Sequence, residues 1–133
     1  MKKLDRTFII DDDPVFVFGI KVIMRKTDSF GELSTYENGQ EAINSLRELV
    51  KNGGKLPSII FLDLNMPIMD GWEFLEDFKK IPEHIRNKVT IYIVSSSVDQ
   101  RDLEKAKDYS YVNNYILKPV TYKDLENVLK EVA

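Results

Sequence analysis

The chain of 133 residues has the length of one globular domain, with 43% hydrophobic and 31% charged residues. It has no cysteine and only one histidine, His84, which excludes disulfides, thiol catalysis and metal sites built on several cysteines or histidines. The net charge of -3 comes with scattered Lys and Arg, so no basic stripe favours direct nucleic-acid binding, and no segment has the pattern of a signal peptide or membrane span. We therefore expect a cytoplasmic protein.

Five apolar segments alternate along the chain with segments of helical character. The apolar segments predict strands over Phe8–Ile10, Leu33–Tyr36, Ile59–Leu62, Val89–Val94 and Tyr111–Leu117. Stretches such as SIIFL and TIYIV are apolar without alternation, which is typical of parallel strands that are covered on both faces.

The segments between the strands begin with residues that favour helix starts. Pro14 suits the first position of a helix, because its missing N–H is not needed there. Capping residues stand three positions before an acidic residue in the pairs Asn38 and Glu41, Asp70 and Glu73, and Thr121 and Asp124. Five strands alternating with five helices predict an α/β fold, a three-layer doubly wound (βα)5 flavodoxin-like domain with a parallel sheet of order 2-1-3-4-5.

Polar residues stand where four of the predicted strands end. They are Asp11, Asp12 and Asp13 after the first strand, Asp63 after the third, Ser95 at the end of the fourth and Lys118 at the end of the fifth. Ligands of such sheets bind beyond the carboxyl ends of the strands, so we expect these side chains to share one crevice. Crowded carboxylates need a compensating cation, and Mg²⁺ accepts oxygen ligands and bridges to phosphate. The residues therefore predict a Mg²⁺ site that can hold a phosphoryl group.

Each of these residues, taken singly, also has a purely structural interpretation. Asp13 precedes Pro14 and can cap the following helix, and Asp11 or Asp12 can do the same. A serine after a strand commonly caps the next helix, and a lone lysine is commonly solvated. The functional interpretation depends on complementary groups standing at four strand ends together.

The motifs at these positions resemble those of a known family. From Thr7 to about Val132 the chain resembles the receiver domain of two-component response regulators. Asp11–Asp12 is similar to the metal-binding pair of that family. The segment DLNMPIMDG, which begins at Asp63, matches its phosphoacceptor signature of an Asp followed by Met-Pro and then Gly.

Further positions extend this resemblance toward the carboxyl end of the chain. Lys118–Pro119 matches the Lys-Pro pair of the family, and Tyr115 matches its common aromatic switch position. Ser95 occupies its Ser/Thr position, where Thr is commoner, and Ser96 follows where Ala is usual. The resemblance implies a cis peptide bond between Lys118 and Pro119.

The resemblance implies a role for each of these residues. Asp63 would be the nucleophile that takes a phosphoryl group from the phosphohistidine of a sensor histidine kinase or a histidine phosphotransfer protein. Asp12 and Asp63 would bind Mg²⁺ directly, Asp11 mainly through a water, and Asn65 through its backbone carbonyl. Lys118 and the hydroxyl of Ser95 would each pair with a phosphoryl oxygen. Such a protein is a signalling switch that catalyses its own phosphorylation and dephosphorylation, and not a conventional enzyme.

The helix after the fourth strand is expected to carry the switch. Its segment, SSSVDQRDLEKAKDYS, is the least hydrophobic of the helical segments, and elements with few buried contacts are easily moved. We expect phosphorylated Asp63 to draw the Ser95 hydroxyl inward and Tyr115 to turn into the vacated space. Tyr115 also fits an aromatic residue half buried at a sheet edge.

The first predicted helix is unusual because it carries two apolar stripes. They consist of Phe16, Ile20 and Ile23, and of Val15, Phe18 and Val22. One stripe faces the core. The other is either exposed beside the acidic residues, where kinases dock in the receiver family, or buried because both sides of the helix are covered.

Two other functions fit parts of the sequence. The segment DDDPV matches the first motif of haloacid-dehalogenase-like phosphatases, with Asp11 as nucleophile and Asp13 as acid. That family needs a further acidic motif after the lysine, whereas only one helix is predicted after Lys118. The phosphatase interpretation also leaves the segment DLNMPIMDG unexplained. The second alternative is a receiver-like binding module that acts without phosphate, although such modules usually lose the Asp or the Lys that this chain keeps.

A flavin site is not favoured, because the first loop is acidic where a flavin phosphate needs Ser, Thr and Gly amides. The chain ends at Ala133, directly after the last predicted helix. We therefore expect residues 1–133 to form a single receiver domain without an output domain. It would act through protein contacts or pass the phosphoryl group onward in a relay.

Overall fold

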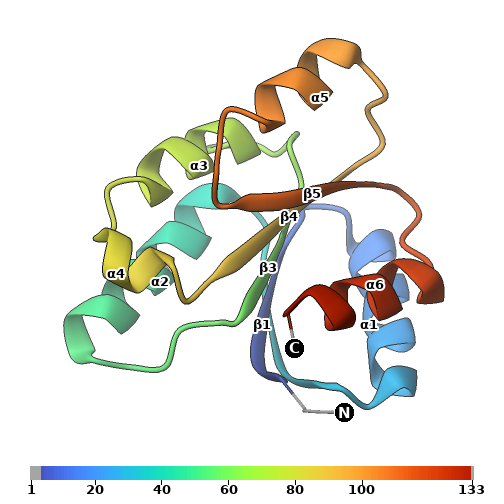
Figure 1. The fold of residues 1–133 in the computed structure, drawn as a ribbon, viewed down its shortest axis with the longest axis horizontal. Helices are drawn as coiled ribbons and strands as arrows, with labels where there is room; N and C mark the ends of the chain where they lie inside the picture. The colour runs from blue at the N-terminus through green and yellow to red at the C-terminus, as the bar shows by residue number, and fades with distance from the viewer. Residues whose placement is uncertain (1–3, 133) are drawn as a thin grey trace.

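A computed structural model describes residues 4–132 as a five-stranded parallel sheet with helices on both faces (Figure 1). The strands are β1 (Leu4–Ile10), β2 (Phe30–Tyr36), β3 (Ile59–Leu62), β4 (Thr90–Ser95) and β5 (Val112–Leu117). The helices are α1 (Pro14–Thr27), α2 (Gly39–Asn52), α3 (Gly71–Phe78), α4 (Glu83–Arg86), α5 (Gln100–Ala106) and α6 (Tyr122–Val132). The strand order β2-β1-β3-β4-β5 confirms the predicted flavodoxin-like topology.

The first two strands are longer than the sequence predicts. β1 begins at Leu4 and not at Phe8, and β2 begins at Phe30 and not at Leu33. Their backbones already pair at Leu4 and Phe30, and the pairing continues through charged residues. Because hydrogen bonds of the backbone hold this part of the sheet, the polar side chains conceal it from a prediction based on hydropathy.

A short helix forms in addition to the five that the sequence predicts. α4 is one turn long, and it brings the helices within residues 4–132 to six, where five were predicted. The guanidinium Nε of Arg86 donates to the carbonyl of Ile81 at 2.7 Å, which fastens the turn to the end of the preceding segment. His84 lies in this turn and is exposed. Four residues are too few to show a helical period.

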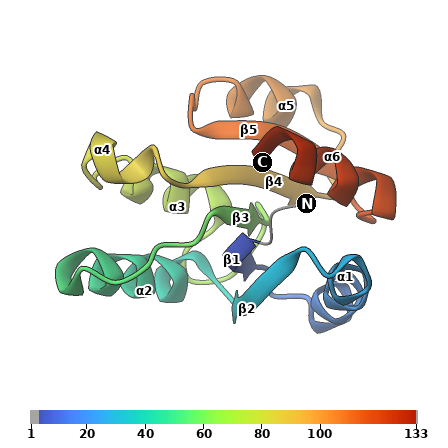
Figure 2. The ribbon, with the colours of Figure 1, turned by 60° about the horizontal axis from the view of Figure 1, so that its bottom comes forward.

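The helices divide between the two faces of the sheet (Figures 1 and 2). Side chains of α2, α3 and α5 pack on one face with residues such as Ile10 and Leu62, while α1 and α6 pack on the other face with residues such as Ile9 and Phe61. Neighbouring residues of a strand point to opposite faces, so a strand covered on both sides is apolar at every position. None of the helices within residues 4–132 is long and apolar enough to cross a membrane.

The structure decides between the two alternatives for the first helix. Ile20 is buried against the sheet, and Phe16 and Ile23 pack beside it. On the other stripe, Val15 is 79% exposed and Phe18 is 68% exposed. The second stripe of α1 therefore faces outward, and the alternative of a helix covered on both sides is wrong.

Candidate functional site

Backbone pairing continues one residue beyond the strand ends and fixes three charged residues. The amide of Asp11 donates to the carbonyl of Tyr36 at 3.0 Å, and that of Asp63 donates to Ile10 at 2.9 Å. The amide of Lys118 donates to the carbonyl of Ser95 at 3.0 Å. The sheet itself thus positions the backbone from which each of these side chains extends.

The alternation along each strand explains why the three side chains share one face. Asp11, Asp63 and Lys118 each stand two positions after an apolar residue, respectively Ile9, Phe61 and Ile116. These apolar residues belong to the core between the sheet and the helices α1 and α6. Residues two positions apart on a strand point the same way, so all three charged side chains emerge at the carboxyl edge on this face.

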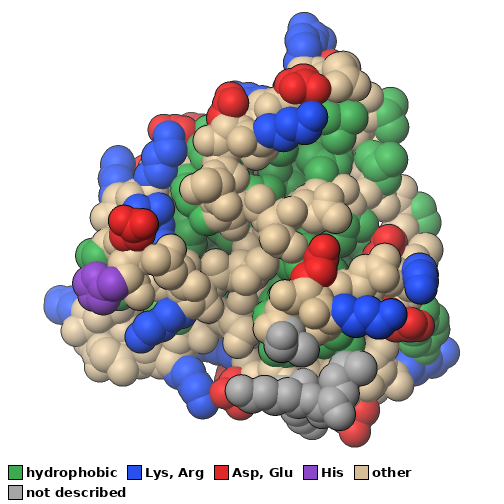
Figure 3. Space-filling model, in the orientation of Figure 1, with side chains coloured by type: hydrophobic (Ala, Val, Ile, Leu, Met, Phe, Trp, Pro, Cys, Tyr) green, Lys and Arg blue, Asp and Glu red, His purple; other side chains and the backbone are tan. Residues whose placement is uncertain are grey.

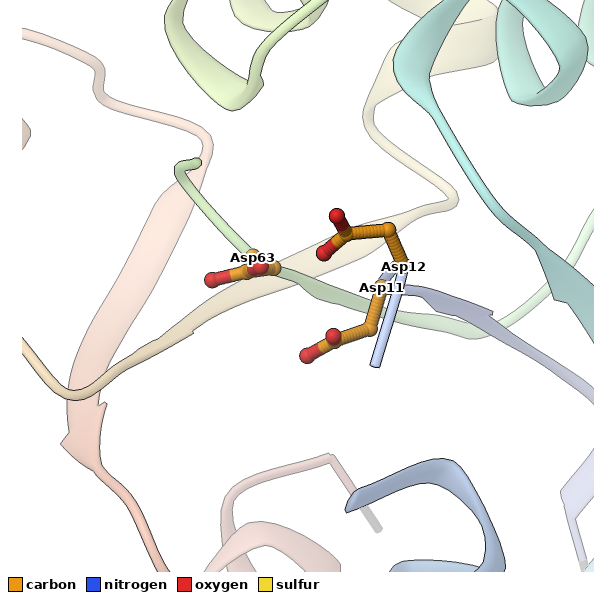
Figure 4. A group of neighbouring side chains, drawn as sticks. All are labelled: Asp11, Asp12 and Asp63. Carbon is orange, nitrogen blue, oxygen red and sulfur yellow. The ribbon is translucent and has the colours of Figure 1, made fainter. Parts of the chain in front are cut away.

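Three carboxylates and one ammonium group meet at this edge. Asp11, Asp12 and Asp63 each offer an oxygen within 4.8 Å of the others, and Figure 4 shows the three side chains gathered at the ends of β1 and β3. The ammonium of Lys118 lies 2.8 Å from Oδ2 of Asp11 and 3.7 Å from Oδ1 of Asp63. Asp11 and Asp63 are buried, whereas Asp12 is exposed.

Backbone amides orient the two buried carboxylates. Oδ1 of Asp11 accepts from the amide of Asp13 at 2.9 Å, and Oδ1 of Asp63 accepts from the amide of Leu64 at the same distance. Asp13 itself caps α1 by accepting from the amide of Val15 at 3.0 Å, and it is exposed. The structural interpretation of Asp13 as a helix cap is therefore confirmed.

Burial and crowding raise the pKa of both buried carboxyl groups. Burial, and next the charge of Asp11, raise the pKa of Asp63 to about 6, although Lys118 opposes the change. Burial likewise raises the pKa of Asp11, against the opposing effect of Lys118. One ammonium group therefore does not balance the negative charge that these side chains carry at neutral pH.

The residues at this edge fit a hard divalent cation. The donors are carboxylate oxygens alone, which Mg²⁺ and similar cations prefer, and a bound cation would offset the repulsion that raises the pKa values. The exposed Asp12 lies on the side open to solvent. Asn65 follows Asp63 by two residues and is exposed, and the role of its carbonyl stays a prediction.

Ser95 and Tyr115 are linked through a residue that the sequence analysis missed. The buried Oγ of Ser95 accepts from the amide of Ser97 at 3.1 Å. The hydroxyl of Tyr115 donates to the carbonyl of the same Ser97 at 3.0 Å. Asp99 caps α5, so Ser95 does not have the capping role of the structural interpretation. Ser97 carries no motif of its own, and only the fold brings Tyr115 to it.

Lys118 is not a solvated lysine. Its side chain is 18% exposed, and its ammonium lies 4.4 Å from the centre of the Phe16 ring. The peptide bond between Lys118 and Pro119 is cis, as expected. The sequence places Phe16 on one of the two apolar stripes of the first helix, and it gives no sign of the contact with Lys118 because the two residues are distant in the chain. The ammonium is thus close enough to the ring face for a cation–π attraction.

Comparison with known proteins gives one family. The family model of the response regulator receiver domain matches residues 7–130. A two-component response regulator from Cytophaga hutchinsonii, whose crystal structure is known, is 38% identical with a TM-score of 0.90, and the match covers 98% of each chain. The phosphorylated cyanobacterial phytochrome response regulator RcpA is 27% identical with a TM-score of 0.76, over 96% of this chain and 90% of that one.

Curated relatives are mostly longer than this chain. The probable methanogenesis regulatory protein FilR2 of Methanothrix harundinacea is 27% identical over 93% of this chain and 78% of its own length. Three further relatives are matched over only 20% to 45% of their length. The shared region is therefore the receiver-sized part of these proteins.

Proposed function

The chain belongs to the response regulator receiver domain family, and on this premise we propose that it is the phosphoacceptor of a two-component phosphorelay. In this proposal Asp63 takes a phosphoryl group from a phosphohistidine of a sensor histidine kinase or a histidine phosphotransfer protein. The observation that supports it most is the convergence of Asp11, Asp12 and Asp63 with Lys118 at one edge of the sheet.

Asp63 has the environment of a nucleophile that is held in place. The Leu64 amide and Lys118 both lie near its Oδ1, which orients the carboxylate and directs Oδ2 toward the crevice in this proposal. A bond forms between this oxygen and the phosphorus while the bond from phosphorus to the imidazole nitrogen breaks. The other nitrogen of the phosphohistidine ring carries a proton, so the imidazole leaves as the neutral ring, and the product is an acyl phosphate.

Positive groups would offset the charge of the transferred phosphoryl group. A bound Mg²⁺ would supply most of this compensation, held by Asp12 and Asp63 directly, by Asp11 through a water and by the carbonyl of Asn65. The ammonium of Lys118 already lies between Asp11 and Asp63, so it can turn to a phosphoryl oxygen when Asp63 is esterified. Its compact charge suits that pairing.

The signal would leave the site through Ser95 and Tyr115. Drawing the Ser95 hydroxyl toward the phosphoryl group would change its contact with the Ser97 amide, and Tyr115 is bonded to the carbonyl of that same residue. Ala106 is the one buried residue of α5 within the described chain, so this helix can move at low cost. The surface formed by α5 and β5 would then present a different shape to a downstream protein.

The comparisons support phosphorylation and weigh against the phosphatase alternative. RcpA, which has a similar fold, is known as a phosphorylated protein. The receiver match spans residues 7–130, whereas the phosphatase alternative would need Asp13 as an acid, and Asp13 caps α1 instead. A binding module that acts without phosphate remains the competing function, and it predicts no esterification of Asp63.

Phosphorylation by a small donor tests the proposal. The protein is incubated with Mg²⁺ and acetyl phosphate, and its intact mass is measured. We expect one added phosphoryl group, which is absent without Mg²⁺ and absent in Asp63→Asn. An unmodified wild-type protein at saturating donor would favour the binding module.

A further inference from the structure

The exposed apolar side chains of this protein are concentrated at one edge. Within residues 4–132, the large hydrophobic side chains that are exposed are Val15, Phe18, Ile68, Val98, Leu117 and Tyr122. Each stands at or shortly after the carboxyl end of β1, β3, β4 or β5, which is the edge that carries Asp63. In Figure 3 hydrophobic side chains lie along the upper right, where Figure 1 shows the loop between β4 and α5. Such a concentration marks an interaction surface.

Ile68 differs from the other five in its backbone. Its φ is 68°, in the left-handed region that a β-branched residue disfavours strongly. Its side chain is 80% exposed, so no burial within this chain compensates for the unfavourable conformation. Glycine or asparagine would adopt the same backbone at lower cost. The amide of Met69 donates to the carbonyl of Pro67 at 2.7 Å across Ile68, so a backbone hydrogen bond supports this turn. The turn presents the apolar side chain of Ile68 to solvent beside the phosphoacceptor loop, where a partner can cover it.

The loop that carries Ile68 is fastened at several points. The amide of Gly71 donates to the carbonyl of Leu64 at 2.9 Å, which closes the loop directly after Asp63. The amide of Gly39 donates to the carbonyl of Met69 at 2.9 Å, and the Met69 side chain is buried. Backbone hydrogen bonds therefore hold the loop on the carboxyl side of Ile68. Binding of a partner to Ile68 would cost little conformational entropy, because the loop is already ordered.

We propose that Ile68 is an anchor residue for the protein that donates the phosphoryl group, an inference that rests on the proposed function. Asp63 is only 6% exposed, so a donor histidine must enter the crevice between the loops that follow the strands. Ile68 stands on the closed loop that directly follows Asp63. The surface of the donor protein around its phosphohistidine therefore covers Ile68 when the histidine reaches Asp63. The partner therefore carries an apolar patch beside its phosphohistidine. A small donor such as acetyl phosphate enters without touching Ile68.

The test compares a protein donor with a small donor. Purified histidine kinase cores from the organism that encodes this chain are autophosphorylated with ATP, and the core that phosphorylates the wild type fastest is the probe. We expect Ile68→Asn to slow transfer from this core at least tenfold. Phosphorylation by acetyl phosphate should be unchanged, and the urea midpoint should be no lower than that of the wild type. Ile68→Val, which keeps a branched apolar side chain, should restore most of the transfer.

A matched control separates the contact from the backbone conformation. Within residues 4–132, Asp28 is the other non-glycine residue with a left-handed φ, and it follows α1 at the opposite edge of the sheet, two residues before β2. Asp28→Gly should leave transfer from the kinase core unchanged.

Four outcomes would refute either the anchor role of Ile68 or the proposed function. Equal transfer to Ile68→Asn and wild type would refute the anchor role, as would equal slowing with acetyl phosphate, which would place the defect in the site itself. The anchor role would also be refuted if acetyl phosphate modifies the wild type but no kinase core transfers a phosphoryl group to it. A wild type that acetyl phosphate does not modify would refute the proposed function instead.

Discussion

At the scale of single residues, Asp63 is held in an environment that opposes its charge. Burial and the neighbouring Asp11 raise its pKa to about 6, above the ordinary value of 3.8. Between these two pH values the folded protein keeps a proton that the unfolded chain has released. The metal-free protein is therefore most stable with respect to this group at pH 4 or below, and it loses about 2–3 kcal/mol as the pH rises through about 6.

Replacing Asp63 by Asn should reverse this loss. At pH 8 without metal, Asp63→Asn removes the buried charge and keeps the shape of the side chain, so we expect a gain of about 1–3 kcal/mol in the free energy of unfolding. Urea titrations of both proteins measure it. The gain should vanish at pH 4, where both side chains are neutral; a variant equally destabilised at both pH values would show that Asp63 is not strained by its charge.

Protons should compete with Mg²⁺ for the same carboxylates. Because the pKa of Asp63 is about 6 and that of Asp11 is also raised, we expect the affinity for Mg²⁺ to fall as the pH is lowered from 8 to 5. Calorimetric titration at several pH values measures this affinity. Constant affinity across that range would mean that the metal does not contact these side chains.

The sequence predicts those site residues that have a signal in their own segment of the chain. Asp11, Asp63, Ser95 and Lys118 each end an apolar segment, so the chain itself marks them once a parallel sheet is assumed. Phe16 carries no such mark, because its contact with Lys118 depends on how α1 packs across the sheet.

At the scale of elements, α1 presents an apolar stripe beside the acidic residues. Phe18 lines a cleft of about 660 Å³ between α1 and the end of β2, whose other walls include Asp11, Asp12 and Arg25. Its position beside the acidic residues predicts that the helix takes part in docking the phosphodonor.

A charge on this stripe should weaken transfer from a protein donor. Because Phe18 is 68% exposed, Phe18→Glu should leave the urea midpoint nearly unchanged while it slows transfer from the phosphorylated kinase core. Acetyl phosphate serves as the control donor and should act at the wild-type rate. Unfolding of the variant would instead mean that this stripe belongs to the core.

The start of α3 leaves no room for a side chain at Gly71. A Cβ at this position would press against the carbonyl oxygen of Asp63 and the Cα of Leu64 at 2.9 Å. We therefore expect Gly71→Ala to displace the backbone of the phosphoacceptor and to lower both stability and the rate of modification by acetyl phosphate. Gly19→Ala is the matched control, since a Cβ there meets nothing within 4 Å. Equal rates in the two variants would contradict the close packing.

At this scale the sequence predicted type and order better than extent. Capping pairs such as Asp70 and Glu73 form as expected, and β3 has the predicted bounds. The first residues of β1 and β2 were not predicted because backbone pairing extends through charged residues there. The helix α4 was not predicted because a single turn is too short to show the helical period of apolar residues.

At the scale of the whole molecule, the sheet order and the site follow from the same pattern. Parallel strands that are apolar throughout require helices on both faces, and the short segments between strands and helices then meet at one edge. The position of Ile68 in the left-handed region was not predictable, because nothing in its type indicates that backbone. Local preference and final structure thus disagree next to the proposed phosphoacceptor.

Identification of the esterified carboxylate tests the central claim most directly. The protein is treated with acetyl phosphate and Mg²⁺, the acyl phosphate is reduced with borohydride, and the peptides are sequenced by mass spectrometry. Reduction converts an esterified aspartate to homoserine. The account predicts that Asp63 is converted and that Asp11 and Asp12 are intact, whereas conversion of Asp11 with Asp63 unchanged would contradict it.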